Sequence, residues 1–166
     1  MDGLNDYQRA VGWLWNLQHT PEAIALVGKD LKIFYVNPSL CELLRITPAQ
    51  MINSSFADIT PEPYKTEDVR NAKLVISGQV IGYEMIKEYQ FSAAHIVKVS
   101  MLVHGVRDPI TDEFLYFISK LTLPEEIQKA KREAGISATQ YINTFWGRIG
   151  IGIAAIGYVI SKAVGL

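Results

Sequence analysis

Apolar runs and the alternation of apolar with polar residues predict five β-strands. The expected strands are 23–28, 31–36, 80–89, 95–106 and 113–121. The turn residues Gly28, Lys29 and Asp30 separate the first two strands, which therefore form a hairpin. Short turns also separate the last three strands, so we expect an antiparallel sheet.

Helical spacing of apolar residues predicts three helices between the second and third strands. The expected helices are 38–45, 48–52 and 65–77. Asn37 and Pro38 suit the start of the first helix, and Gly78 suits the end of the last. Because the helices are grouped between strands of an antiparallel sheet, the pattern indicates an α+β domain.

Four stretches of sequence resemble a known family. They read YVNPSLCELLRITPAQM, FADITPEP, VRNAKLVISGQVIGYEM and VHGVRDPITDEFLYFISKL, in this order. Together they resemble the PAS domain family over about 100 residues, a size that suits one domain with a single core. The resemblance implies a PAS-like five-stranded antiparallel sheet with short helices on one face. It also implies a role in sensing or in partner binding.

On this interpretation the chain has four parts. An N-terminal flanking amphipathic helix (1–20) precedes the PAS domain (21–123), and a connector helix (124–146) leads to a transmembrane or tail-anchor helix (147–166). The resemblance implies that the flanking helix either packs on the outer face of the sheet or pairs with the same helix of a second subunit. The connector is either one rod or two shorter helices with a hinge at Gly135.

Residues 149–166 have the apolar character of a membrane-spanning helix. The segment contains one charged residue, Lys162, and is about as long as the bilayer core requires. Cationic residues such as Arg148 precede it, so the PAS domain is expected on the cytoplasmic side. Small residues four apart, such as Gly157 and Ser161, would let this helix self-associate. Burial in a larger protein assembly is the alternative.

The PAS-like architecture leaves room for a cavity between the sheet and the long helix. The candidate lining residues are Ile33, Tyr35, Leu44, Phe56, Val75, Tyr83, Met101 and Phe117. Each of these side chains is also suited to a plain hydrophobic core. As a ligand site, this apolar lining would suit a hydrophobic or aromatic molecule better than an anion.

The sequence contains no motif for catalysis or metal binding. The three histidines lack metal-ligand spacing, and there is neither a glycine-rich phosphate loop nor a nucleophile elbow. We therefore expect a protein that is not an enzyme. The formal net charge of -1 gives no electrostatic basis for nucleic-acid binding. Cys41, which lies beside leucines, is expected to be a small buried hydrophobic residue.

No cofactor is assigned from the sequence. The Asn-Cys-Arg-Phe-Leu pattern of cysteinyl-flavin PAS domains is absent, and the helix 65–77 lacks the histidine with which related sensors bind haem. Val80 and Ile81 stand where flavin-binding energy-taxis receptors have a tryptophan, which disfavours flavin. Lys120 replaces the aspartate of an Asp-Ile-Thr motif that, in many PAS domains, helps to fix the outgoing helix.

These features favour a membrane-tethered PAS sensory or interaction module that is not an enzyme. It would signal or dock through protein partners, with control by a small ligand. Self-association would use the N-terminal and C-terminal helices. The alternative is a structural or assembly subunit of a larger membrane complex, in which the PAS fold is a docking surface.

The membrane assignment predicts that the full chain stays with the membrane fraction during carbonate extraction. High pH releases peripheral proteins, whereas a helix that spans the bilayer core remains in lipid. Recovery of the protein in the soluble fraction would contradict a spanning segment at 149–166.

Overall fold

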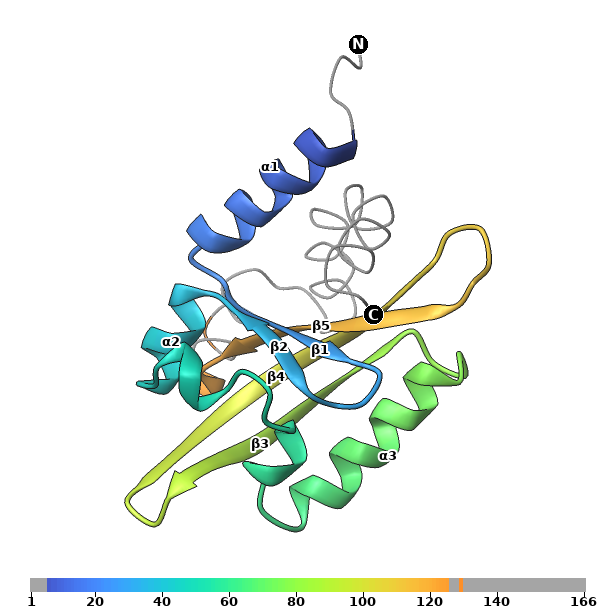
Figure 1. The fold of residues 1–166 in the computed structure, drawn as a ribbon. Coiled ribbons are helices and arrows are strands. Elements are labelled where there is room, and N and C mark those ends of the chain that lie inside the picture. The colour runs from blue at the N-terminus through green and yellow to red at the C-terminus, as the bar shows by residue number, and fades with distance from the viewer. Residues whose placement is uncertain (1–5, 126–128, 130–166) are drawn as a thin grey trace.

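Five antiparallel strands form one sheet in the computed structural model, which describes residues 6–125 and Lys129 (Figure 1). The strands are β1 (Ala23–Gly28), β2 (Ile33–Val36), β3 (Gly82–Ser92), β4 (His95–Arg107) and β5 (Phe114–Thr122). Their order across the sheet is β2-β1-β5-β4-β3, so β5 is the central strand. The prediction of an α+β domain with a five-stranded antiparallel sheet is confirmed.

Helices lie on both sides of this sheet. They are α1 (Asp6–His19), α2 (Pro38–Leu44), α3 (Tyr64–Ile76) and two 3₁₀ turns, η1 (Pro48–Gln50) and η2 (Phe56–Asp58). The inner face of the sheet is the one covered by α2, α3 and the 3₁₀ turns (Figure 1). Residues of α1 contact the opposite, outer face.

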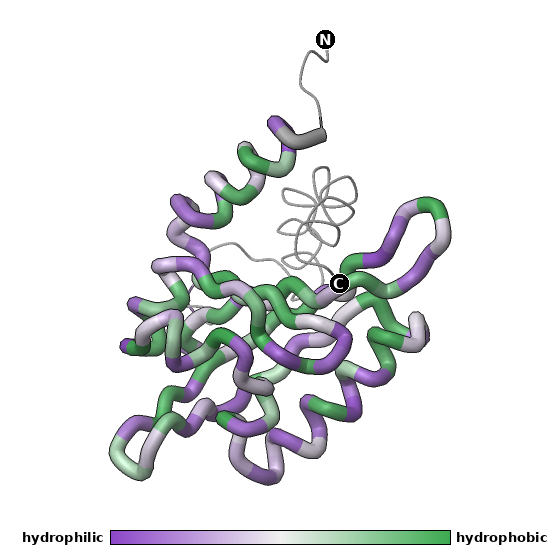
Figure 2. The backbone as a smooth tube through the Cα atoms, viewed as in Figure 1, coloured by the Kyte–Doolittle hydropathy of each residue, from purple (hydrophilic) through white to green (hydrophobic). Residues whose placement is uncertain are grey.

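Each face of the sheet has its own hydrophobic core. The inner core packs Leu40 of α2 and Val75 of α3 against sheet residues such as Val99 and Phe117. The outer core consists of Trp13, Leu17, Ile24, Leu26, Leu102, Val106, Tyr116 and Ile118. Figure 2 shows hydrophobic residues along the central strands and hydrophilic ones in the turn between β1 and β2. The two cores follow from the alternation of side chains between the faces of a sheet.

Several element limits differ from the predicted ones, for example β3, which was predicted as 80–89, and two of the differences have clear local reasons. β2 begins at Ile33 rather than Leu31, because Leu31 has a left-handed backbone (φ 66°) and still belongs to the turn. The predicted helix 48–52 is a 3₁₀ turn of three residues. It cannot extend far, since Asn53 is also left-handed (φ 69°).

Two predicted parts lie outside the described residues. They are the connector helix 124–146, apart from Pro124, Glu125 and Lys129, and the transmembrane or tail-anchor helix 147–166. Within the described ranges, no helix combines the length and the apolar character that crossing a bilayer requires.

The buried side chain of Asn37 joins α1, β1 and α2. Its Oδ1 accepts hydrogen bonds from the backbone N–H of Ile24 (2.9 Å) and of Leu40 (3.0 Å), the second of which caps α2. Its Nδ2 donates to the backbone oxygens of Leu17 (3.0 Å) and Glu22 (2.7 Å). One amide thus satisfies four backbone groups that would otherwise be buried without partners.

Replacement of Asn37 by alanine is predicted to lower the free energy of unfolding by about 3 kcal/mol, because it leaves buried backbone groups unpaired. Asn37→Asp should cost a similar amount, since its carboxylate would face the carbonyl oxygens of Leu17 and Glu22. Urea denaturation measures both changes, with Asn16→Ala on the exposed side of α1 as the control. A loss below about 1 kcal/mol for Asn37→Ala would contradict this role.

Candidate functional site

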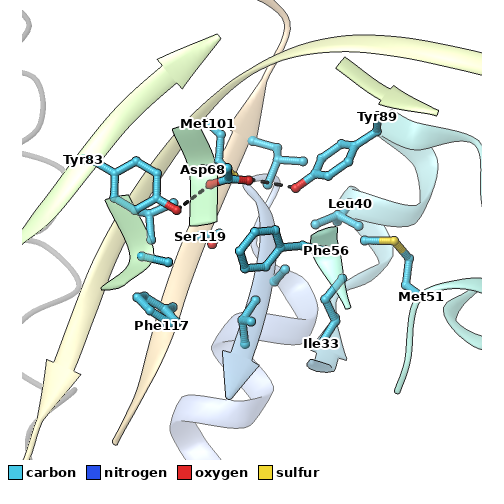
Figure 3. Close-up of a pocket in the computed structure, with 15 residues that line it drawn as sticks. Ile33, Leu40, Met51, Phe56, Asp68, Tyr83, Tyr89, Met101, Phe117 and Ser119 are labelled. Atoms are coloured by element: carbon cyan, nitrogen blue, oxygen red, sulfur yellow. Dashed lines mark hydrogen bonds between the residues drawn. The ribbon is translucent and has the colours of Figure 1, made fainter. Parts of the chain in front are cut away.

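A small cavity lies in the inner core, between the sheet, α3 and η2 (Figure 3). Its lining residues are Ala25, Val27, Ile33, Leu40, Met51, Phe56, Asp68, Ala72, Tyr83, Tyr89, Met101, Val103, Phe117, Ser119 and Leu121. The space open to the centre of a water molecule is about 20 Å³. That is enough for about one water, because one needs roughly 10–15 Å³ by this measure. A flavin or a haem does not fit in a space of this size.

Five of the eight residues proposed from the sequence line this cavity. They are Ile33, Phe56, Tyr83, Met101 and Phe117. Leu44 and Val75 are buried in the inner core but do not line the cavity. The sequence therefore located the inner face of the sheet but not the limits of the cavity.

The placement of Tyr35 on the inner face was wrong. Tyr35 packs on the outer core, and its hydroxyl donates to Gln18 of α1 at 3.2 Å. An irregularity in the pairing of β1 with β2 explains the change of face: Tyr35 is opposite Leu26, but Ile33 is opposite the next residue, Val27. Such a bulge breaks the alternation on which the prediction relied.

An ion pair is buried beside the cavity. Lys87 of β3 pairs through Nζ with Oδ2 of Asp68 on α3, and neither side chain is exposed to solvent. The hydroxyl of Tyr83 donates to Oδ1 of Asp68 at 2.6 Å, and Lys87 also donates to Oγ1 of Thr60 at 3.3 Å. Both charges are thus paired and hydrogen-bonded, as buried charges must be.

Aromatic rings complete the surroundings of Lys87. Its Nζ lies 4.2 Å from the ring centroid of Tyr89 and 5.1 Å from that of Phe56, within range of cation–π attraction. Burial, followed by the charge of Asp68, raises the pKa of Tyr83 far above its usual value. Burial also raises the pKa of Tyr89, although Lys87 opposes this effect. Both phenols therefore stay neutral at physiological pH.

Sequence reasoning missed Asp68, Lys87, Thr60 and Tyr89, although two of them carry a recognisable signal. Lys87 falls on the same alternate positions of its strand as the inner residues Tyr83 and Met85. Asp68 lies one helical turn before Ala72, which is buried on α3. Opposite charges at core positions of two adjacent elements are the pattern that predicts a buried ion pair.

The two charged groups of the site are paired with each other. Asp68 and Lys87 neutralise each other, and the rest of the lining is largely apolar. No group of three metal-ligating side chains occurs in the part of the chain that the structure describes. Burial, followed by the charge of Glu42, raises the pKa of the Cys41 thiol, which disfavours the reactive thiolate.

Solved structures of other proteins share this fold. A PAS domain from a two-component sensor histidine kinase matches 71% of this chain and 98% of its own, with a TM-score of 0.55 and 15% identity. A domain of a sensory box sensor histidine kinase/response regulator from Geobacter sulfurreducens has a TM-score of 0.54 and 12% identity, over 72% of this chain and 98% of its own. The PAS-B domain of Cycle from Drosophila melanogaster, with bound ethylene glycol, has a TM-score of 0.53 and 15% identity, over 60% and 97%.

Sequence comparisons agree with this fold. Residues 17–81 match the family model described as the PAS fold. The probable diguanylate cyclase DgcE of Escherichia coli (strain K12) is 27% identical over 117 residues, which is 70% of this chain. The match spans only 10% of the length of DgcE. The described domain is thus an α+β domain, and its fold is the PAS fold.

Disruption of the buried ion pair tests its energetic importance. Lys87→Met or Asp68→Leu alone should lower the free energy of unfolding by about 3–5 kcal/mol, because each leaves one buried charge unpaired. The double variant should be clearly more stable than either single variant. Urea denaturation provides all four free energies of the cycle.

Glu88 and Lys98 provide a matched control, because they are opposite each other on β3 and β4 and Lys98 is exposed. Replacing either of them should change the free energy of unfolding by less than about 1 kcal/mol. If the effects of Lys87→Met and Asp68→Leu simply add in the double variant, the two side chains are not energetically coupled.

Proposed function

We propose that this chain is a non-catalytic PAS sensory and interaction module, tethered to a membrane, which acts through protein partners. The observation that carries the proposal is the division of the apolar residues of α1 between two surfaces. Trp13 and Leu17 belong to the outer core of the domain. Val11, Leu14 and Trp15 are 46%, 41% and 61% exposed.

The exposed residues of α1 have the spacing of a helix contact surface. Val11, Leu14 and Trp15 stand at positions i, i+3 and i+4, so they lie together on one side of the helix. The ring of Trp15 stacks on that of His19 with the centroids 4.2 Å apart, which adds an aromatic surface to this stripe. Clustered apolar and aromatic side chains are typical of protein interfaces. A second copy of α1 would present the same stripe and cover it symmetrically.

A signalling role is supported by the fold and by the proteins that share it. One similar domain belongs to a sensor histidine kinase, and the similar stretch of DgcE belongs to a probable diguanylate cyclase. The match to DgcE covers a tenth of that protein. We infer that this PAS domain is likewise a sensory domain, and that it passes its signal to a protein partner.

Control by a small ligand would need movement of the inner core. The cavity accommodates about one water as it stands. Met51 and Met101 line it, and methionine side chains adapt to new shapes more readily than branched ones. An apolar ligand would therefore enter by displacing these two side chains, next to the buried ion pair.

The membrane tether and the cytoplasmic side are inferred from the sequence alone. Both rest on the apolar composition of 149–166 and on the cationic residues before it. If two copies pair through the N-terminal helix, such a tether would raise the local concentration of the domains and promote their association.

The proposed role predicts that the purified full chain in detergent self-associates through α1. Leu14→Glu should shift it from dimer to monomer in sedimentation velocity, because a carboxylate would be buried in the apolar contact. Trp15→Ser should weaken the dimer by removing its largest exposed side chain. Asn16→Ala, next to Trp15 and exposed, is the control and should leave the dimer intact.

A monomeric wild type, or a dimer that both substitutions leave unchanged, would contradict association through α1. Recovery of the chain in a fixed complex of several different subunits would instead favour the structural role.

A further inference from the structure

Ser119 presents a buried hydroxyl to the internal cavity. It lies on β5 between the inner-core residues Phe117 and Leu121, and it is 5% exposed. Its side chain lines the cavity (Figure 3), and its hydroxyl has no hydrogen-bond partner among the described residues. A buried hydroxyl without a hydrogen-bond partner lowers the stability of the fold, so a polar molecule bound in the cavity would be favoured at this position.

The carboxylate of Asp68 lines the same cavity and can accept further hydrogen bonds. One of its oxygens accepts from Tyr83 and the other from Lys87. A carboxylate offers about four acceptor sites, so roughly two remain. The cavity therefore combines an acceptor on α3 with a donor and acceptor on β5.

The size and charge of the cavity limit the guest. The space of about 20 Å³ holds one molecule of the size of water. Since Asp68 is already neutralised by Lys87, a cation or an anion would bring an unpaired charge into the core. The guest must therefore be small and neutral, and it must donate to a carboxylate while also bonding to a hydroxyl.

We propose that this cavity binds one water molecule, which donates to the carboxylate of Asp68 and exchanges a hydrogen bond with the hydroxyl of Ser119. The water links α3, which carries one half of the ion pair, to the central strand β5. An apolar ligand that entered the core would have to displace it and would leave Ser119 unpaired. The inference rests on the ligand-control part of the proposed function and is independent of association through α1.

Oxygen-17 magnetic relaxation dispersion, which counts long-lived internal waters, tests this proposal on the purified full chain. Ser119→Ala should hold one long-lived water fewer than the wild type, because it removes one of the two polar partners. Ser100→Ala is the matched control. Ser100 of β4 is 3% exposed and lies two residues before Leu102, so it is on the outer face of the sheet. Removal of its hydroxyl should leave the number of long-lived waters unchanged.

A crystal structure provides the second readout. Electron density for a water should lie within hydrogen-bond distance of both Ser119 and Asp68, and it should be absent from the Ser119→Ala variant. Equal water counts in the wild type and in Ser119→Ala would overturn the proposal, as would an equal loss in Ser100→Ala. Neither outcome depends on whether the protein is a dimer, so failure here is distinguishable from failure of the proposed self-association.

Discussion

The inner face of this domain depends on the buried pair of Asp68 and Lys87. Two charges that are fully removed from solvent are tolerated only if they pair with each other and gain further hydrogen-bond or ring contacts. Tyr83, Thr60 and the ring of Tyr89 meet this requirement. The pair therefore restricts how α3 can pack on β3, because a shift of the helix by one turn would leave both buried charges without a partner. An apolar core of the same volume would not impose that register.

The central strand β5 connects this inner arrangement to the outer face. Ser119 faces the cavity, whereas the next residue, Lys120, is on the opposite side and pairs with Glu22 at 2.5 Å between Nζ and Oε2. Glu22 also receives a hydrogen bond from Asn37 at its backbone oxygen. Through this ion pair, Lys120 contacts the segment between α1 and β1. Ser119 is thus connected to α1 through its neighbour Lys120, through Glu22, and through the hydrogen bonds of Asn37 to Glu22 and Leu17.

Most of the fold could be predicted from the sequence. Strands with one solvent-exposed face and helices with recognisable capping residues have strong local sequence patterns. Tyr35 was misplaced because a bulge depends on the pairing of two strands, which no single strand reveals. Lys87 and Asp68 were missed because isolated charges are normally solvated, and only the packing of α3 on β3 shows that they meet. The size of the cavity depends on how fifteen side chains pack, which periodicity does not determine.

The central proposal is that this domain with the PAS fold fills its interior with its own side chains and acts by contact with other proteins. Native mass spectrometry of the freshly purified full chain, released from detergent, tests it most directly because bound groups and subunit number are read from one mass. The account predicts a dimer with the mass of two polypeptides and no organic cofactor. A monomer that carries the mass of a flavin or a haem would contradict it.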